Sequence, residues 1–239
     1  MSRKVALFAT CLGDQLWPEV VQATADVLQR AGCVVTFDPA QTCCAQPAFN
    51  SGYQDEARAV ARRFVEIFER ADAIVAPSGS CTAMVHRYPD LFRDEPKWRA
   101  RAEAVAHKAF EFSSFLVREL GVTDVGATLR ARVAWHDACH GLRELGVHDE
   151  PRALLAAVRG LELVDLRTGE ACCGFGGTFA VKFPELSTAM LDHKLSALDE
   201  RVDVLSAIDS SCLMQIRGRL QRRGSRVRAL HLAEILAST

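Results

Sequence analysis

The chain has 239 residues, of which 49% are hydrophobic and 25% charged, as in a globular protein with room for one large or two smaller domains. A formal net charge of −1 argues against nucleic acid or an anionic membrane as a partner. No apolar run approaches the roughly 18 residues that a membrane span needs. The short apolar run at residues 5–10 is expected to be a buried first strand of a cytoplasmic protein.

Strands and helices are predicted to alternate through the first half. Apolar positions at helical spacing predict a helix that begins near Pro18 and ends before Gly32. Predicted next are a strand at residues 34–37, a helix at 57–68 and a strand at 73–76. Residues 98–120 are expected to form one long helix, followed by a linker at 121–128. The predicted domains are therefore residues 1–127 and 128–239.

The second half repeats this order. Strands are predicted at residues 133–138, 161–164 and 202–205, and a helix is predicted to open at Pro184. Such alternation is typical of an α/β fold with mainly parallel sheets. We predict two similar, duplicated, Rossmann-like domains related by pseudo-two-fold symmetry.

Nine cysteines are many for a cytoplasmic chain of this length, and eight of them fall into two matching sets. Cys139 follows Cys11 by 128 positions, and the other three members follow their counterparts by 129 to 131 positions. The first set is Cys11, Cys43, Cys44 and Cys81, and the second is Cys139, Cys172, Cys173 and Cys212. Only Cys33 has no counterpart. Cysteines at patterned spacing in a reducing compartment indicate metal binding or redox chemistry.

Each set is predicted to converge on one metal centre. A cysteine follows each of three predicted strands, and ligands of open parallel sheets bind beyond the carboxyl ends of the strands. Adjacent cysteines fit a single tetrahedral zinc ion poorly, whereas a wider iron–sulfur cluster can use both. The turn after the second pair holds Gly174, Gly176 and Gly177, which are expected to bring backbone N–H groups close to the cofactor.

The cysteine pattern resembles the cysteine-rich CCG domain. This domain occurs in duplicate in the cysteine-rich subunit of heterodisulfide reductase and in iron–sulfur subunits of glycolate oxidase and anaerobic glycerol-3-phosphate dehydrogenase. The resemblance covers essentially the whole chain and is strongest to short stand-alone members that act in lactate utilization. The stretches that carry it are PSGSCTAM at residues 77–84, HDACHGLRELG at 136–146, CCGFGGTF at 172–179 and SCLM at 211–214.

The resemblance implies an iron–sulfur electron-transfer subunit of a complex that oxidises L-lactate to pyruvate. It implies an iron–sulfur cofactor, expected to be [4Fe–4S], with zinc as an occupant in aerobically prepared protein. It also implies two partners, a ferredoxin-like iron–sulfur protein and a third small protein. In heterodisulfide reductase a fifth cysteine completes each set, but here Met84 and Gln215 stand at that position. Ala45 replaces the glycine after the first pair, so the second site is expected to be the stronger.

His136, His140 and Arg143 are candidates for a direct role in the reaction. Both histidines flank Cys139 and can bind metal or move protons, His136 or His140 with Asp137 as a base. Arg143 can pair with a substrate carboxylate. The chain has no glycine-rich dinucleotide fingerprint after a strand and no phosphate-binding loop.

Three alternatives stay open at this stage. The chain can be a zinc-binding structural or assembly protein, because thiolates with a nearby histidine suit tetrahedral zinc. It can be a thiol redox sensor that forms a strained disulfide between adjacent cysteines. It can also act on another 2-hydroxy acid, such as glycolate, which is close to lactate in shape.

Overall fold

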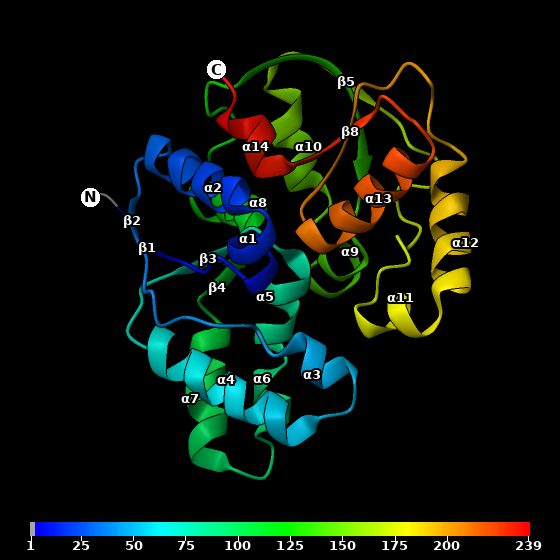
Figure 1. Ribbon diagram of the computed structural model, residues 1–239. Helices are drawn as coiled ribbons and strands as arrows, with labels where there is room; N and C mark the ends of the chain where they lie inside the picture. The colour runs from blue at the N-terminus through cyan, green and yellow to red at the C-terminus, as the bar shows by residue number, and fades with distance from the viewer. Residues whose placement is uncertain (1–2) are drawn as a thin grey trace.

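The computed structural model describes residues 3–239, so Met1 and Ser2, which open the predicted first domain, lie outside the described residues. Two four-stranded sheets organise the molecule, each built from one half of the chain (Figure 1). All described strand pairs are parallel, and the strand order is β2-β1-β3-β4 in one sheet and β6-β5-β7-β8 in the other. The identical order confirms the predicted α/β fold with two similar, Rossmann-like halves.

The first half places short strands between helices. Its strands are β1 (Lys4–Leu7), β2 (Val34–Thr36), β3 (Ile74–Ala76) and β4 (Ala109–Glu111). Its helices are α1 (Cys11–Leu16), α2 (Pro18–Arg30), α3 (Gln46–Asn50), α4 (Gln54–Phe68), α5 (Gly79–His86), α6 (Tyr88–Leu91), α7 (Pro96–Ala106), α8 (Phe112–Ser114) and the π-helical turn η1 (Phe115–Glu119). As predicted, α2 begins at Pro18, whose fixed φ suits a first helical turn, and Gly32 follows its end with φ 86°.

The second half follows the same plan. Its strands are β5 (Thr128–His136), β6 (Arg159–Val164), β7 (Val204–Ala207) and β8 (Arg228–His231). Its helices are α9 (Cys139–Leu145), α10 (Asp149–Ala156), α11 (Thr178–Lys182), α12 (Pro184–Leu195), α13 (Ser210–Arg222) and α14 (Leu232–Ala237). The predicted domain boundary between residues 127 and 128 remains a prediction, and it coincides with the start of β5.

The prediction of one long helix over residues 98–120 was wrong. The helix α7 ends at Ala106, and β4 then pairs with β3, with Ile74 opposite Ala109 and Ala76 opposite Glu111. Ala109 and Glu111 are buried and Phe110 is half-buried, a period-two pattern too short to stand out in the sequence. Tertiary pairing with β3 therefore overrides the helical propensity of this segment.

Helices of each half pack against helices of the other half across a pseudo-two-fold axis. In Figure 1, α2 lies beside α14 of the other half, and the equivalent contact joins α10 to α8. A second pair of contacts, α5 with α9 and α1 with α13, follows the same exchange. One continuous core of buried side chains includes Val5 and Leu7 of β1 together with Val133 and Val204 of the second sheet. The halves therefore pack as one body.

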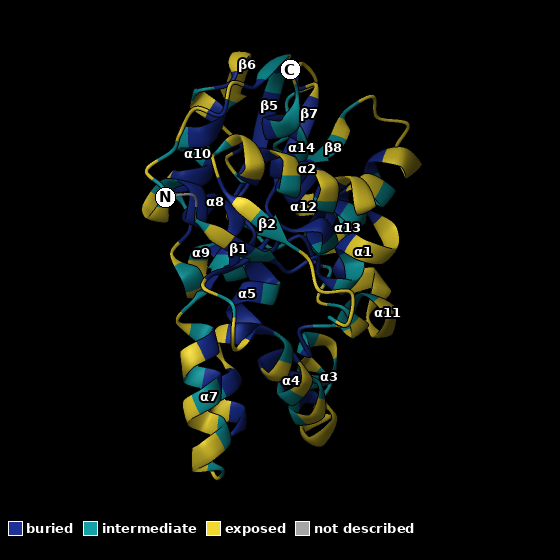
Figure 2. Ribbon diagram, turned by 90° about the vertical axis from the view of Figure 1, so that its left-hand side faces the viewer, coloured by how far each residue is buried: buried dark blue, intermediate teal, exposed yellow. Residues whose placement is uncertain are grey.

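A second, smaller core belongs to the first half alone. It contains Phe8, Phe64, Phe68 and Tyr88 and lies under α4, α6 and α7. Figure 2 shows α4 and α7 projecting from the body, with exposed residues on their outer faces. Among residues 3–239, no helix is both long enough and apolar enough to cross a membrane.

Candidate metal centre

The cysteines of the first set gather beyond the carboxyl ends of three strands. Cys11 opens α1 directly after β1, the pair Cys43 and Cys44 lies between β2 and α3, and Cys81 lies in the first turn of α5 after β3. The Sγ atoms of Cys11 and Cys43 are 3.6 Å apart. The Cys44 thiol donates hydrogen bonds to Cys43 and to Cys81, so the four thiols form one connected group.

The thiols of the first set differ sharply in acidity. Hydrogen bonds from Cys11 and Cys44 lower the pKa of Cys43 to about 3. The bond to Cys43, together with burial, raises the pKa of Cys11 far above its usual value of 9.0. A thiolate is the form that binds metal, so Cys43 is prepared to act as a ligand at neutral pH.

The second set has the same arrangement. Cys139 follows β5, Cys172 and Cys173 follow β6, and Cys212 lies in the first turn of α13 after β7. The Sγ atoms of Cys173 and Cys212 are 3.0 Å apart, while Cys139 and Cys172 share a hydrogen bond. The sequence prediction that each set converges therefore agrees with the geometry, and ligation itself remains a proposal.

The thiols of the second set also differ in acidity. Hydrogen bonds from Cys139 and Cys173 lower the pKa of Cys172 to about 2. A hydrogen bond from Cys173 lowers the pKa of Cys212 to about 6. Cys172 and Cys212 therefore both favour the thiolate form at neutral pH.

The same unusual backbone turns occur at equivalent positions in the two halves. The residue before the first cysteine has positive φ in both, 63° at Thr10 and 42° at Ala138. The residue after the cysteine pair does too, 70° at Ala45 and 80° at Gly174. Residues other than glycine rarely adopt a positive φ, and backbone strain of this kind is common at functional sites. Ala45 therefore adopts the same backbone conformation as Gly174, although it is not a glycine.

Both cysteine sets face one cavity between the halves. The cavity has a volume of ≈ 390 Å³. The first half contributes Cys11, Cys44 and Cys81 to its wall, and the second half contributes Cys139, Cys172, Cys173 and Cys212. Gly176 and Gly177 also line it. Gly174 does not, but its N–H donates to Cys172 Sγ at 3.3 Å. The sequence indicated two centres but not that they share a cavity.

A buried hydrogen-bond network joins the halves at the cavity wall. Asp209 precedes Cys212 by three residues, as Ser78 precedes Cys81. The hydroxyl groups of Ser78 and Ser80 each donate to Asp209 Oδ1 at 2.7 Å. The equivalent residues of the two repeats therefore meet at the pseudo-two-fold axis, and this contact fixes the two cysteine sets relative to one another.

The three candidate residues of the reaction lie in different surroundings. His136 is buried, and its Nδ1 lies 3.1 Å from the carbonyl oxygen of Gly169. Its neighbour Asp137 is not its partner, because that carboxylate accepts two hydrogen bonds from Arg152, at 2.6 and 2.9 Å. His140 lines the cavity, with Nδ1 3.7 Å from Cys139 Sγ. Arg143 is exposed and is not among the described residues that line the cavity.

Lys194 lies near the second cysteine set and was not predicted. It is fully buried in α12, and its Nζ donates to the carbonyl oxygens of Thr168 at 2.7 Å and Gly169 at 3.0 Å. Burial lowers its pKa to about 8, against the attraction of Cys173 and other nearby anions. A signal existed in the sequence, since Lys194 falls on the apolar face of this helix, beside Leu191 and Leu195.

The donor atoms fit a thiolate-bound metal cofactor. Each half offers four thiols linked one to the next, and soft thiolate donors select iron–sulfur clusters, zinc or Cu(I). In the second half, the donor atoms of His136, Cys173 and Cys212 all lie within 4.8 Å of one another. A metal or iron–sulfur cofactor is therefore consistent with the side chains present.

Comparison with known proteins places this geometry in a family. The signature described as a cysteine-rich domain (CCG) matches residues 5–86 and 133–217, one match in each half. Proteins named lactate utilization protein A are similar over nearly their whole length. The one from Exiguobacterium sp. is 51% identical, over 97% of this chain and 96% of its own. Those from Bacillus velezensis and Bacillus subtilis are 48% and 46% identical, each over 98% of this chain and 99% of their own. The chain therefore belongs to the cysteine-rich CCG domain family, with two copies of the domain, and to the same family as the lactate utilization A proteins.

Proposed function

We propose that this chain is the iron–sulfur electron-transfer subunit of a cytoplasmic complex that oxidises L-lactate to pyruvate. The observation that carries the proposal is the pair of four-thiol groups that open into one cavity. The names of the relatives supply the substrate. The expected partners are a ferredoxin-like iron–sulfur protein and a third small subunit.

Each cysteine set is assigned to one metal centre. Cys11, Cys43, Cys44 and Cys81 hold the first centre, and Cys139, Cys172, Cys173 and Cys212 hold the second. When bound, [4Fe–4S] clusters would accept and pass on single electrons. The backbone N–H of Gly174 stabilises the Cys172 thiolate, and Gly176 and Gly177 contribute a stretch of the cavity wall that carries no side chain.

The cavity is also the candidate site for a small 2-hydroxy acid. Oxidation of lactate to pyruvate releases two electrons and two protons, so a base is needed for the hydroxyl proton. His140 is the candidate base, because it lines the cavity and its side chain is 34% exposed, which allows proton exchange with solvent. Glycolate differs from lactate by one methyl group and is the competing substrate.

Anaerobic purification followed by iron and sulfide analysis tests the cofactor. We expect iron and acid-labile sulfide in the purified chain, with broad visible absorption that reduction bleaches. A Bacillus subtilis strain lacking its own lactate utilization protein A, supplied with this chain, then tests the function by growth on lactate. A chain that stays free of iron after reconstitution with ferrous iron and sulfide contradicts the proposal.

A zinc-binding structural or assembly role is the second candidate. One observation favours it, namely the close grouping of His136, Cys173 and Cys212, since a zinc ion at about 2.0–2.3 Å from each donor fits within that spacing. Stoichiometric zinc in anaerobically purified protein would support this role. So would growth on lactate that survives Cys43→Ser and Cys44→Ser but fails when zinc is removed.

A further inference from the structure

The carbonyl oxygen of Gly169 determines which nitrogen of His136 carries the proton. Three groups point at this oxygen: the backbone N–H of Asp137 at 3.1 Å, Lys194 Nζ at 3.0 Å and His136 Nδ1 at 3.1 Å. A carbonyl oxygen only accepts hydrogen bonds, so Nδ1 carries a proton. In the neutral imidazole, Nε2 is then left with a free lone pair.

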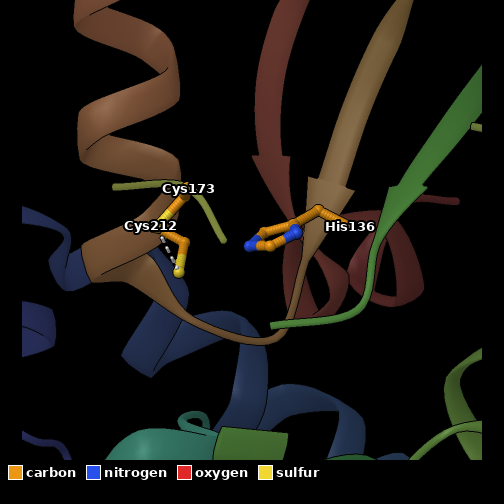
Figure 3. A group of neighbouring side chains, drawn as sticks. All are labelled: His136, Cys173 and Cys212. Carbon is orange, nitrogen blue, oxygen red and sulfur yellow. Dashed lines mark hydrogen bonds between the residues drawn. The ribbon is translucent and has the colours of Figure 1, made fainter. Parts of the chain in front are cut away.

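That lone pair is buried and without a hydrogen-bond partner. His136 is 1% exposed, and its Nε2 has no partner within residues 3–239. Figure 3 shows the imidazole ring directed toward the sulfur atoms of Cys173 and Cys212. An unsatisfied buried polar atom destabilises the folded state, and coordination of a metal would satisfy it.

The hydrogen bonds around His136 also fix the position of its ring. Lys194 shares the Gly169 carbonyl oxygen with it. The carboxylate of Asp137 is engaged by Arg152. Histidines that bind metals commonly donate their other N–H to a backbone carbonyl, which fixes the ring as it is fixed here.

We propose that His136 binds the metal of the second centre through Nε2, together with Cys173 and Cys212. This inference rests on the proposed function only for the identity of the metal. The first half has no such ligand, because Phe8 stands 128 positions before His136, the same offset that separates Cys11 from Cys139. The two centres therefore differ in kind, the first with thiolate ligands alone and the second with a neutral imidazole added.

Pulsed electron paramagnetic resonance tests the ligand directly. The full chain carrying Cys43→Ser and Cys44→Ser is labelled with ¹⁵N-histidine and reconstituted anaerobically with ferrous iron and sulfide, so that the second centre alone contributes. We expect a strongly coupled ¹⁵N nucleus that disappears in His136→Phe, which reproduces Phe8 of the first half. His140→Ala is the matched control and should retain it.

The outcomes separate this inference from the function on which it rests. Iron uptake without strongly coupled ¹⁵N, or a coupling that survives His136→Phe, overturns the ligand and leaves the iron–sulfur function standing. A chain that takes up no iron contradicts the function, and Co(II) binding followed by X-ray absorption then tests the ligand, since His136→Phe must lose the imidazole scattering. If His136→Phe does not fold, as judged by circular dichroism, His136→Gln replaces it in each measurement.

Discussion

The walls behind the two cysteine sets differ far more than the sets themselves. Behind the first set the wall is aromatic: the rings of Phe8 and Phe64 are 4.8 Å apart, and the Tyr88 hydroxyl donates to the Cys44 carbonyl oxygen at 3.0 Å. Behind the second set lie His136 and Lys194, polar and buried. Duplication has thus kept the backbone that presents the thiols while the electrostatic surroundings diverged. A negatively charged cofactor is better stabilised beside Lys194 than beside an aromatic wall.

The largest effect should come from removing one cysteine pair at a time. Cys172→Ser with Cys173→Ser, and separately Cys43→Ser with Cys44→Ser, should each remove half of the bound iron, because each pair serves its own centre. The second-half variant should reduce lactate-dependent growth more. Iron content per chain and growth on lactate are the measurements. If either double variant loses all its iron, one centre bridges the cavity and the description of two separate centres is wrong.

The two turns after the cysteine pairs should respond in opposite directions to exchange of alanine and glycine. Gly174→Ala places a Cβ against the Ser187 carbonyl oxygen at φ 80°, and should lower the free energy of unfolding by about 3 kcal/mol. Ala45→Gly relieves the backbone strain at φ 70°. It should raise the free energy of unfolding by about 0.5 kcal/mol, because the greater freedom of glycine in the unfolded chain offsets part of the relieved strain. Denaturant unfolding of the metal-free chain measures both. A change in the free energy of unfolding of the same sign in both variants would mean that the two turns are not equivalent.

Lys194 should make the stability of the second half depend on pH. Its pKa is lowered by burial from 10.5 to about 8, so between these values the unfolded chain binds more protons than the folded chain. Stability should therefore rise with pH across this window, by about 2 kcal/mol, relative to a Lys194→Met variant. The difference between the two metal-free proteins is the quantity to measure, because it cancels the titration of the thiols. A flat difference would contradict the lowered pKa.

A smaller effect than that of Lys194 is expected on the aromatic side. Tyr88→Phe keeps the ring and removes the hydrogen bond to the Cys44 carbonyl oxygen, which should cost about 1 kcal/mol of stability. Thermal unfolding measures it, and the iron content of the second centre should not change. Loss of iron from the second centre in this variant would show that the two walls are coupled across the cavity.

Much of the candidate site could be predicted from the sequence because it depends on local order along the chain. The offsets that relate Cys11 to Cys139 and Cys81 to Cys212 revealed the duplication, and a cysteine after each strand of a parallel sheet has only one edge to occupy. Periodicity located α2, α4 and α12 for the same reason. The short edge strand β4 was missed, since three residues leave too few repeats for a pattern to emerge.

By itself, then, the sequence determined the α/β class, the duplication and the eight cysteines that converge in two sets, all properties of spacing along the chain. Tertiary structure alone decided that both sets open into one cavity, because this depends on how helices from the two halves exchange and on the bond between Ser78 and Asp209. It also decided the surroundings of His136. Its free Nε2 depends on a carbonyl 33 residues away, at Gly169, and no local pattern encodes such a contact.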